Sequence, residues 1–364
     1  MRDFGAIGDN STDDTEAFTA ALDAAEAQAN GSRPYGSVVS VPEGEYFVDQ
    51  IRMRSQVTLA GYGPSTIIRK NSGIATPLVV LDKDTTNFTV LRDLRLRGNR
   101  YGGGGQGVAH GIFYQNSEDG NEIKQAERFA FHADGQHRIS NVTVDAVDGN
   151  GVHIFARETH IDHCLIGDIT KNGLVLDGSD NWVTNTSINW TGHSGVVVNG
   201  GNNYLSGVKC WYIGTDTSYE EADAFLIVAS RQTLTGCMAQ DISRYGLNLK
   251  GADNCIVSSM MLDNIGNFHV SQNQGFDHPP LSGAVMLFKQ SGLTTYNSIS
   301  VALAQRSANL TNINAFVHFG DGSQNNSATI SGDYGANTLT NQPITRSGDI
   351  SAYNNFAIVN GRVA

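Results

Sequence analysis

The chain has 364 residues and a formal net charge of −12 at pH 7, from 24 Lys and Arg against 36 Asp and Glu. This charge argues against a nucleic-acid partner, because proteins that bind backbone phosphates present a basic surface. Only 16% of the residues are charged, Gly is abundant (41) and Pro is scarce (7), a balance typical of a turn-rich β protein. No apolar run approaches the ~20 residues of a membrane span, so we expect no membrane partner.

The first predicted element is an amphipathic helix that begins after residue 13. Asp13 followed by Glu16 is a candidate capping box. One face of the helix is apolar and is formed by Ala17, Phe18, Ala21, Leu22 and Ala25. A repeat protein needs its open end covered, so we predict that residues 1–36 form an N-terminal cap.

Short motifs around this helix resemble a known family. They read Asp3-Phe4-Gly5-Ala6, Gly8-Asp9 and Asp13-Asp14-Thr15, and they are similar to the opening of the pectate-lyase-like superfamily of right-handed parallel β-helix proteins, which includes many phage tailspikes. SVVSVPEGEYFV (37–48) resembles the first coil of that family, and residues 57–61 resemble the second. The resemblance implies a fold but no single chemistry, because lyases, hydrolases, epimerases and non-enzymatic receptor binders share it.

The middle of the chain repeats itself with a period of 22 residues. Residues 137–158, 159–180 and 181–202 follow one another without a gap, and each contains a Gly followed by aliphatic residues at alternate positions. One column of aliphatic residues consists of Ile139, Ile161, Val183, Leu205, Leu234 and Ile256. A spacing of two predicts strands, and the fixed period predicts coils stacked about 4.8 Å apart. We therefore predict an all-β, single-stranded right-handed parallel β-helix over 37–322, followed by C-terminal β-rich coils over 323–364.

The four cysteines can be placed on this repeat. Cys164, Cys210 and Cys237 fall in inward columns, whereas Cys255 falls in an outward one. Cys164 and Cys237 lie three coils apart, roughly 14 Å, which is too far for a disulfide. We predict four free thiols, and no metal site, because no two cysteines have the spacing of metal ligands.

Outward positions of the Gly-initiated strand are the expected place for function. They form a mixed apolar and polar stripe with room for an extended sugar chain. Its two columns are His153, Val175, Val197, Leu226 and Asn248, and Phe155, Asp177, Asn199, Val228 and Lys250. Insertions at about 100–136, 215–223 and 266–282 are predicted to wall this groove. The predicted substrate-binding residues are His153, Phe155, Asn199, Glu221, Asn248 and Lys250.

The turn before this strand carries charged residues that do not repeat. Lys171, His193 and Arg244 stand two residues before the reference Gly of their coils, and an acidic insertion ends in Glu221 and Asp223. A lyase needs a base for the proton beside a uronate carboxylate and a cation for that carboxylate, whereas a hydrolase needs two carboxylates. The predicted catalytic residues are His193, Arg244, Asp223, Lys171 and Asp177. Solvated turn side chains, a structural ion pair and a turn cap at Asp177 are the alternative interpretations.

Two branches of the family give different expectations for these positions. In β-helix polygalacturonases the catalytic acids lie where Asp223 stands, but the Asn-Thr-Asp, Asp-Asp and Gly-His-Gly signatures are missing. In β-helix alginate epimerases an Asp-Pro-His-Glu run occupies the strand that reads Val152-His153-Ile154-Phe155 here, and Asp177 matches an acidic residue of the next coil. The resemblance thus implies a related scaffold with a different active site, or none.

A second surface holds aromatic residues. His160, Trp182 and Tyr204 stand in one outward column. Such a column either binds sugar rings or forms a ladder that stabilises the coils, and the ladder is the favoured interpretation.

The function predicted from these observations is binding and cleavage of an extracellular polysaccharide, by β-elimination in a lyase. The alternatives are a tailspike-type glycoside hydrolase and a non-catalytic phage tail protein that binds a receptor. We expect no required cofactor, with Ca²⁺ bridging a carboxylate and the substrate as the exception kept open. The expected location is extracellular, secreted or in a virion tail, and the resemblance implies a homotrimer if the chain is a tail protein.

Overall fold

The computed structural model describes residues 1–30, 36–71, 76–83, 86–101, 110–115, 135–216, 221–266, 283–288, 294–304, 315–319, 323–333, 344–346, 356–359 and 362–363. The chain forms two compact units. Unit 1 comprises Met1–Thr170 and Asp177–Trp182, and unit 2 comprises Lys171–Leu176 and Val183–Ala364. Among the described residues, no helix is both long and apolar enough to cross a membrane.

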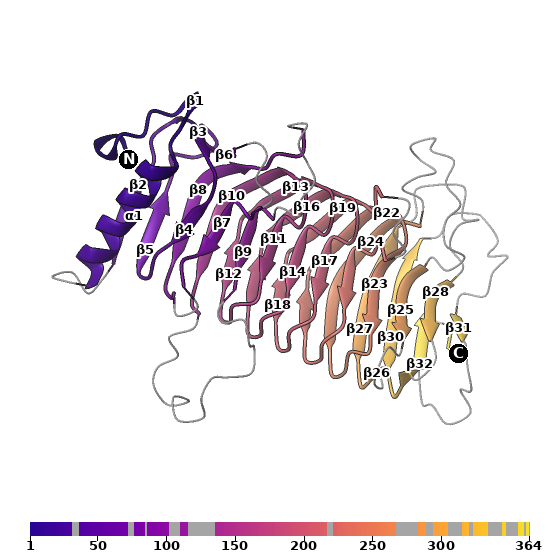
Figure 1. Ribbon diagram of the computed structural model, residues 1–364. Coiled ribbons are helices and arrows are strands. Elements are labelled where there is room, and N and C mark those ends of the chain that lie inside the picture. The colour runs from indigo at the N-terminus through magenta and orange to yellow at the C-terminus, as the bar shows by residue number, and fades with distance from the viewer. Residues whose placement is uncertain are drawn as a thin grey trace. The chain divides into compact units, whose positions relative to one another are not determined.

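Unit 1 begins with a capped end and continues as stacked coils (Figure 1). Helix α1 (Thr15–Asn30) packs against β2, β4 and β5. The elements of the unit are a 3-10 turn (Arg2–Phe4), β1 (Asp9–Asp13), β2 (Ser37–Ser40), β3 (Gly44–Val48), β4 (Ile51–Met53), β5 (Val57–Ala60), β6 (Thr66–Lys70), β7 (Val79–Leu81), β8 (Val90–Arg97), β9 (Ile112–Tyr114), β10 (Arg138–Val147), β11 (Val152–Ile154), β12 (His160–Asp162) and β13 (Leu165–Ile169). Strand β15 (Trp182–Thr184) starts on the last residue of unit 1.

Unit 2 is built of the same kind of coil. Its strands are β14 (Leu174–Leu176), β16 (Ser187–Thr191), β17 (Val196–Val198), β18 (Tyr204–Ser206), β19 (Lys209–Ile213), β20 (Phe225–Ile227), β21 (Thr233–Thr235), β22 (Met238–Ile242), β23 (Tyr245–Lys250), β24 (Ile256–Ile265), β25 (Gly283–Phe288), β26 (Thr294–Thr295), β27 (Ser298–Ala304), β28 (Ala315–Phe319), β29 (Ser323–Gln324), β30 (Ser327–Asp333), β31 (Ile344–Arg346), β32 (Phe356–Val359) and β33 (Arg362–Val363).

The strands pair in parallel with the spacing of the sequence repeat. In unit 1, Arg138–Ser140 of β10 pair with His160–Asp162 of β12, and Thr143 pairs with Leu165. In unit 2, β14 pairs with β17 and β17 with β20 in the same parallel way. Only β32 and β33, among the pairings within the described residues, run antiparallel. Each unit is thus a stack of β-helix coils, and the fold is the predicted parallel β-helix.

The core consists of the aliphatic columns that the repeat identifies. The inward residues of β14, β17, β20 and β23 are fully buried, and they are Leu174, Leu176, Val196, Val198, Phe225, Ile227, Leu247 and Leu249. Burying such a side chain contributes about 1.5–3 kcal/mol. On the outside of unit 1, the rings of His160 and Trp182 are stacked, with centroids 4.6 Å apart and an angle of 10° between their planes, the arrangement of a ladder between coils.

All four cysteines are free thiols, as predicted, and all four are buried. The inward placement of Cys164, Cys210 and Cys237 is confirmed, whereas the outward placement of Cys255 was wrong. From β21 to β24 the register is one residue longer than 22, since Thr233 pairs with Ile256 and Leu234 with Val257. Val257 therefore takes the inward place assigned to Ile256, which is 54% exposed. Cys255 falls in a buried turn column of unit 2 whose other members are Asn203 and Gln232. The turn column with the same place in the coils of unit 1 consists of the buried residues His137, Thr159 and Asn181.

Residue His137 of this turn column should make the protein sensitive to acid. Its side chain is fully buried, with Nδ1 2.8 Å from Thr89 Oγ1, and burial lowers its pKa from 6.5 to about 4. Below pH 6.5 the imidazole binds a proton in the unfolded chain but not in the folded chain. The stability that depends on a neutral His137 is therefore complete above pH 6.5 and is lost as the pH falls toward 4. At about pH 5 we expect a loss of about 2 kcal/mol.

Denaturant unfolding at neutral pH and at about pH 5 measures this effect. The variant His137→Asn, which keeps a polar turn side chain but cannot titrate, should lose less stability between the two pH values than the wild type. Equal losses in both proteins would show that His137 is not responsible.

Candidate functional site

One candidate site lies in unit 1 on strand β11 and on the residue that follows β14. His153 projects from β11, and its Nε2 lies 2.6 Å from Oδ2 of Asp177. Both side chains are mostly buried, 14% and 19% exposed. The backbone holds Asp177 in place, because its N–H donates to the carbonyl of Ile154 at 2.8 Å. The prediction placed these residues on one outward face, and the structure brings them into direct contact.

The hydrogen bonds indicate which nitrogen of each histidine is basic. A carboxylate only accepts, so Nε2 of His153 carries the proton and Nδ1 is the basic atom. The amide nitrogen of Asn150 lies 3.4 Å from that Nδ1. The backbone N–H of Asn150 donates to Nδ1 of His110 at 3.1 Å, which leaves Nε2 of His110 as a donor. The site thus offers an acceptor nitrogen at His153 and a hydrogen-bond donor at His110.

Aromatic rings surround this pair. The His153 ring stacks on Phe155 with centroids 4.7 Å apart and meets Phe113 edge to face at 5.3 Å. His110 stacks on Phe113 at 5.3 Å. Phe155 is 39% exposed, so an apolar surface on which a sugar ring can stack adjoins the base.

His110 and Phe113 were missed as site residues because they lie inside the segment assigned to an insertion. Phe113 is the middle residue of β9 and pairs in register with His153. The missed signal is the run Gly111-Ile112-Phe113-Tyr114, which has the same pattern as Gly151-Val152-His153-Ile154. Residues 102–109 and 116–134 of that insertion lie outside the described residues.

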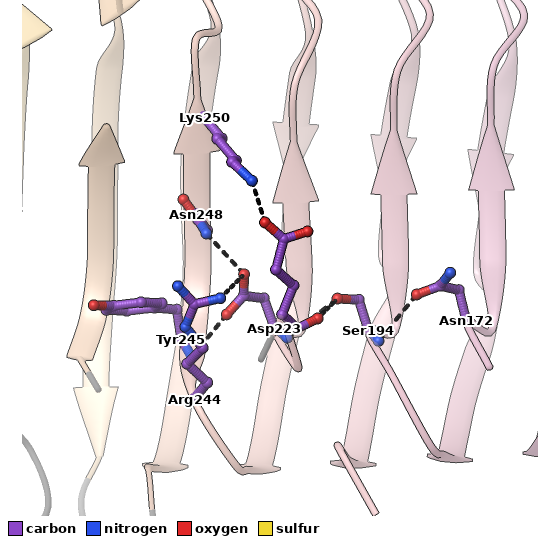
Figure 2. Close-up of polar contacts among 8 residues, drawn as sticks. Asn172, Ser194, Asp223, Arg244, Tyr245, Asn248 and Lys250 are labelled. Atoms are coloured by element: carbon purple, nitrogen blue, oxygen red, sulfur yellow. Dashed lines mark hydrogen bonds and ion pairs between the residues drawn. The ribbon is translucent and has the colours of Figure 1, made fainter. Parts of the chain in front are cut away.

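A second cluster lies in unit 2, where Asp223 belongs to a column of turn residues (Figure 2). Each side chain of the column accepts a hydrogen bond from the backbone of the next coil. Asn172 Oδ1 accepts from Ser194 N at 3.1 Å, Ser194 Oγ from Asp223 N at 3.2 Å, and Asp223 Oδ1 from Tyr245 N at 3.2 Å. Asp223 is therefore a carboxylate in a place that neighbouring coils fill with Asn and Ser.

Asp223 is fully buried and organises two predicted site residues around it. Asn248 Nδ2 donates to its Oδ2 at 2.8 Å, and Nη1 of Arg244 lies 3.7 Å from the same oxygen. Burial raises the pKa of Asp223, and Arg244 opposes that shift. Because Asp223 is shielded from solvent, its carboxylate is placed to orient the side chains of Arg244 and Asn248.

The other predicted charges of unit 2 are also paired. Glu221 and Lys250 form an ion pair. His193 Nε2 lies 3.7 Å from Asp216, and burial together with Lys171 lowers the pKa of His193 although Asp216 raises it. Arg244, whose side chain is 16% exposed, lies beside the buried Asp223 and is not an open cationic group. Asn199 is exposed after β17.

The stripe between these polar residues is not the open surface that the sequence predicted. Val175, Val197 and Leu226 are 5%, 9% and 4% exposed and form a hydrophobic cluster with the partly buried Val228. These apolar side chains pack on one another across adjacent strands. The predicted wall residues 217–220 and 267–282 lie outside the described residues. Within the part of the chain that the structure describes, no three His, Cys, Asp or Glu residues are grouped as metal ligands.

Residues 1–221 match the model of the family described as rhamnogalacturonase A/epimerase, pectate lyase-like. The chain belongs to this family. The matched part of the chain includes the residues around His153 and Asp177. Four residues of the second cluster lie beyond its end: Asp223, Arg244, Asn248 and Lys250.

Two bacterial proteins are similar in sequence to part of the chain. Mannuronan C5-epimerase AlgE2 of Azotobacter vinelandii is 29% identical over 233 residues, 56% of this chain and 22% of that protein. Alginate lyase 7 of the same organism is 28% identical over 198 residues, 47% of this chain and 22% of that protein. The chain thus spans about a fifth of the length of these two curated relatives.

A solved structure shares the family's fold over nearly the whole chain. The enzymatically active domain of tailspike protein 2 from bacteriophage CBA120 superposes with a TM-score of 0.69 at 16% identity, covering 98% of this chain and 51% of that one. At this identity the likeness concerns the fold, and it supports the parallel β-helix.

Proposed function

We propose that the chain is the β-helix of an extracellular polysaccharide-modifying enzyme that removes the proton beside a uronate carboxylate, with His153 as the base. The observation that carries the proposal is the 2.6 Å contact between His153 Nε2 and Asp177 Oδ2. It fixes the imidazole so that Nδ1 is the basic atom, next to an exposed aromatic surface. The relatives named as mannuronan epimerase and alginate lyase support a uronate polymer as the substrate.

The side chains of this site can share the steps of an elimination. Nδ1 of His153 takes the proton from the carbon beside the carboxylate, and Asp177 stabilises the imidazolium that forms. The electron pair of the broken C–H bond forms a carbon–carbon double bond, and the bond to the leaving glycosidic oxygen breaks. That oxygen gains a proton from the imidazolium of His153, which returns His153 to its neutral form. His110 also donates toward the charge that develops on the carboxylate.

Elimination fits the site better than hydrolysis does. Hydrolysis of a glycosidic bond uses two carboxyl groups that flank it. Here the carboxylate of Asp177 contacts the imidazole of His153 and is placed to orient it. The carboxylate of Asp223, in unit 2, is fully buried. Return of the proton to the opposite face of the same carbon would instead give an epimer. Both outcomes begin with the same step at His153.

The test is incubation of the purified chain with polymannuronate, polyguluronate, polygalacturonate and glucuronan. Elimination predicts a rise in ultraviolet absorbance from the unsaturated uronate, and epimerisation predicts an altered proton spectrum at constant chain length. New reducing ends without the absorbance would show hydrolysis, and no change with any of the four polymers would contradict an enzymatic function at this site.

A further inference from the structure

A groove opens on another part of unit 1, over the beginnings of β2, β5 and β8. It encloses about 490 Å³ and is lined by Gly36, Ser37, Val38, Gln56, Thr58, Phe88 and Val90. We call it the β2–β5–β8 groove. Its floor is preorganised by backbone hydrogen bonds from Ser37 to Gln56 (3.1 Å) and from Gln56 to Asn87 (3.0 Å). None of the residues proposed to act on a uronate lines this groove.

Phe88 is the unusual residue of the groove. Its ring is 44% exposed, beside Val38, which is 60% exposed. Phe88 also has a left-handed backbone, with φ of 51°. A bulky apolar residue is a true outlier in that conformation, which Asn and Asp adopt more easily. The same turn of other coils in unit 1 holds polar residues with positive φ, namely Gln136, Glu158 and Asp180.

The positive φ belongs to the turn itself, since Gln56 and Gln136 adopt it in neighbouring coils. The ring of Phe88, however, is 44% exposed, so it adds little to the core and is open to a ligand. The polar atoms of the groove indicate what the ligand is. Gln56 and Thr58, whose side chains carry an amide and a hydroxyl, line the groove. An aromatic ring with a few neutral donors and acceptors matches the apolar face and hydroxyl groups of a sugar.

The charge of the lining selects between classes of sugar. The seven residues that line the groove within the described part of the chain are uncharged, so none of them offers a cation to a uronate carboxylate. A neutral saccharide needs no such cation.

We propose that the β2–β5–β8 groove is a second, non-catalytic saccharide site that binds a neutral sugar residue stacked on Phe88. Such a site would hold the protein on the neutral part of a mixed glycan or on a neighbouring cell-surface polymer. The inference does not depend on the reaction assigned to His153.

Calorimetric titration of the His153→Ala protein with cellohexaose, mannohexaose, xylohexaose and galactohexaose tests this proposal. We expect binding of at least one of these neutral hexasaccharides, and a tenfold or greater loss of affinity in Phe88→Asn. Because Asn tolerates the left-handed conformation, this variant should keep or raise the melting temperature, so that lost binding is not lost folding.

The matched control is Tyr62→Ala, which removes an aromatic side chain that is 64% exposed in the same unit, and it should leave the affinity unchanged. Binding of none of the four hexasaccharides, or equal affinity in Phe88→Asn and the parent protein, would overturn the proposal. So would self-association in sedimentation experiments that Phe88→Asn abolishes, because a second copy of the chain would then occupy the groove.

Discussion

Replacing His153 with alanine should lower the rate of uronate modification by ~10²–10⁴-fold, the usual effect of removing a general base. The variant should still fold, because the His153 side chain lies on the outward face and its removal leaves the buried neighbours Val152 and Ile154 in place. Initial rates of unsaturated product on the most active polymer, together with the melting temperature, measure the two properties separately.

The variant Asp177→Asn should act through His153. An amide can donate to Nε2 and so favours the tautomer in which Nδ1 carries the proton, which is the wrong one for the proposed base. We expect a lower turnover and an altered pH profile, with little change in KM. Full activity of either variant on every polymer would contradict the assignment of the base.

A second histidine–carboxylate pair in unit 1 provides the control. Nδ1 of His163 lies 2.6 Å from Asp162, the same separation as in the pair at the site, but its side chain is 65% exposed and lies after β12. His163→Ala removes the same chemical groups from a surface that has no role in the proposal. It should therefore leave the rate unchanged.

Replacing Asp223 with alanine should destabilise the protein by about 3–5 kcal/mol, the usual effect of removing one partner of a buried ion pair. The alanine would leave the backbone N–H of Tyr245 and the amide of Asn248 without their acceptor, and Arg244 without its counter-ion. Denaturant unfolding measures the loss. A change below about 1 kcal/mol would contradict the organising position assigned to Asp223.

Two variants show which property of Asp223 matters. Asp223→Asn keeps an oxygen that can accept from Tyr245, as Asn172 accepts from Ser194 of the next coil, so it should lose less than the alanine variant. Glu221→Gln removes a carboxylate from a partly exposed pair, 32% and 18% exposed, and should lose less than about 1 kcal/mol. Each of the three variants, Asp223→Ala, Asp223→Asn and Glu221→Gln, removes one negative charge. Equal losses of stability in all three would show that the change in net charge, and not the burial of Asp223, is the cause.

The fold was predictable from the sequence because each coil repeats the same local rules. Aliphatic residues two apart predict the strands, and their recurrence after 22 residues predicts the parallel stack, as the pairing of β10 with β12 confirms. The error at Cys255 and Ile256 has the same origin. A fixed period was extended through a turn that holds one more residue, and one residue of shift exchanges the inward and outward faces of a strand.

The candidate site was predictable only in part. Outward alternation placed His153, Phe155 and Asp177 on one face, but it could not show that His153 and Asp177 are in contact. The sequence also made Asp223 a candidate catalytic residue at the end of an acidic insertion, because it does not show that this carboxylate is buried and accepts from the backbone of the next coil. Val175, Val197 and Leu226 alternate outward as expected, yet they are buried by packing on one another.

The additional residue between Lys250 and Ile256 shows that a coil of this protein can change its length while the stack continues. Strand β24 keeps its aliphatic side chains inside after the longer turn, with Val257 and Leu262 2% and 0% exposed. A longer turn therefore does not move the core residues of the strand that follows it. Segments can be lengthened, shortened or replaced at a corner while the stack persists, so that a family with this scaffold can change its surface chemistry one coil at a time.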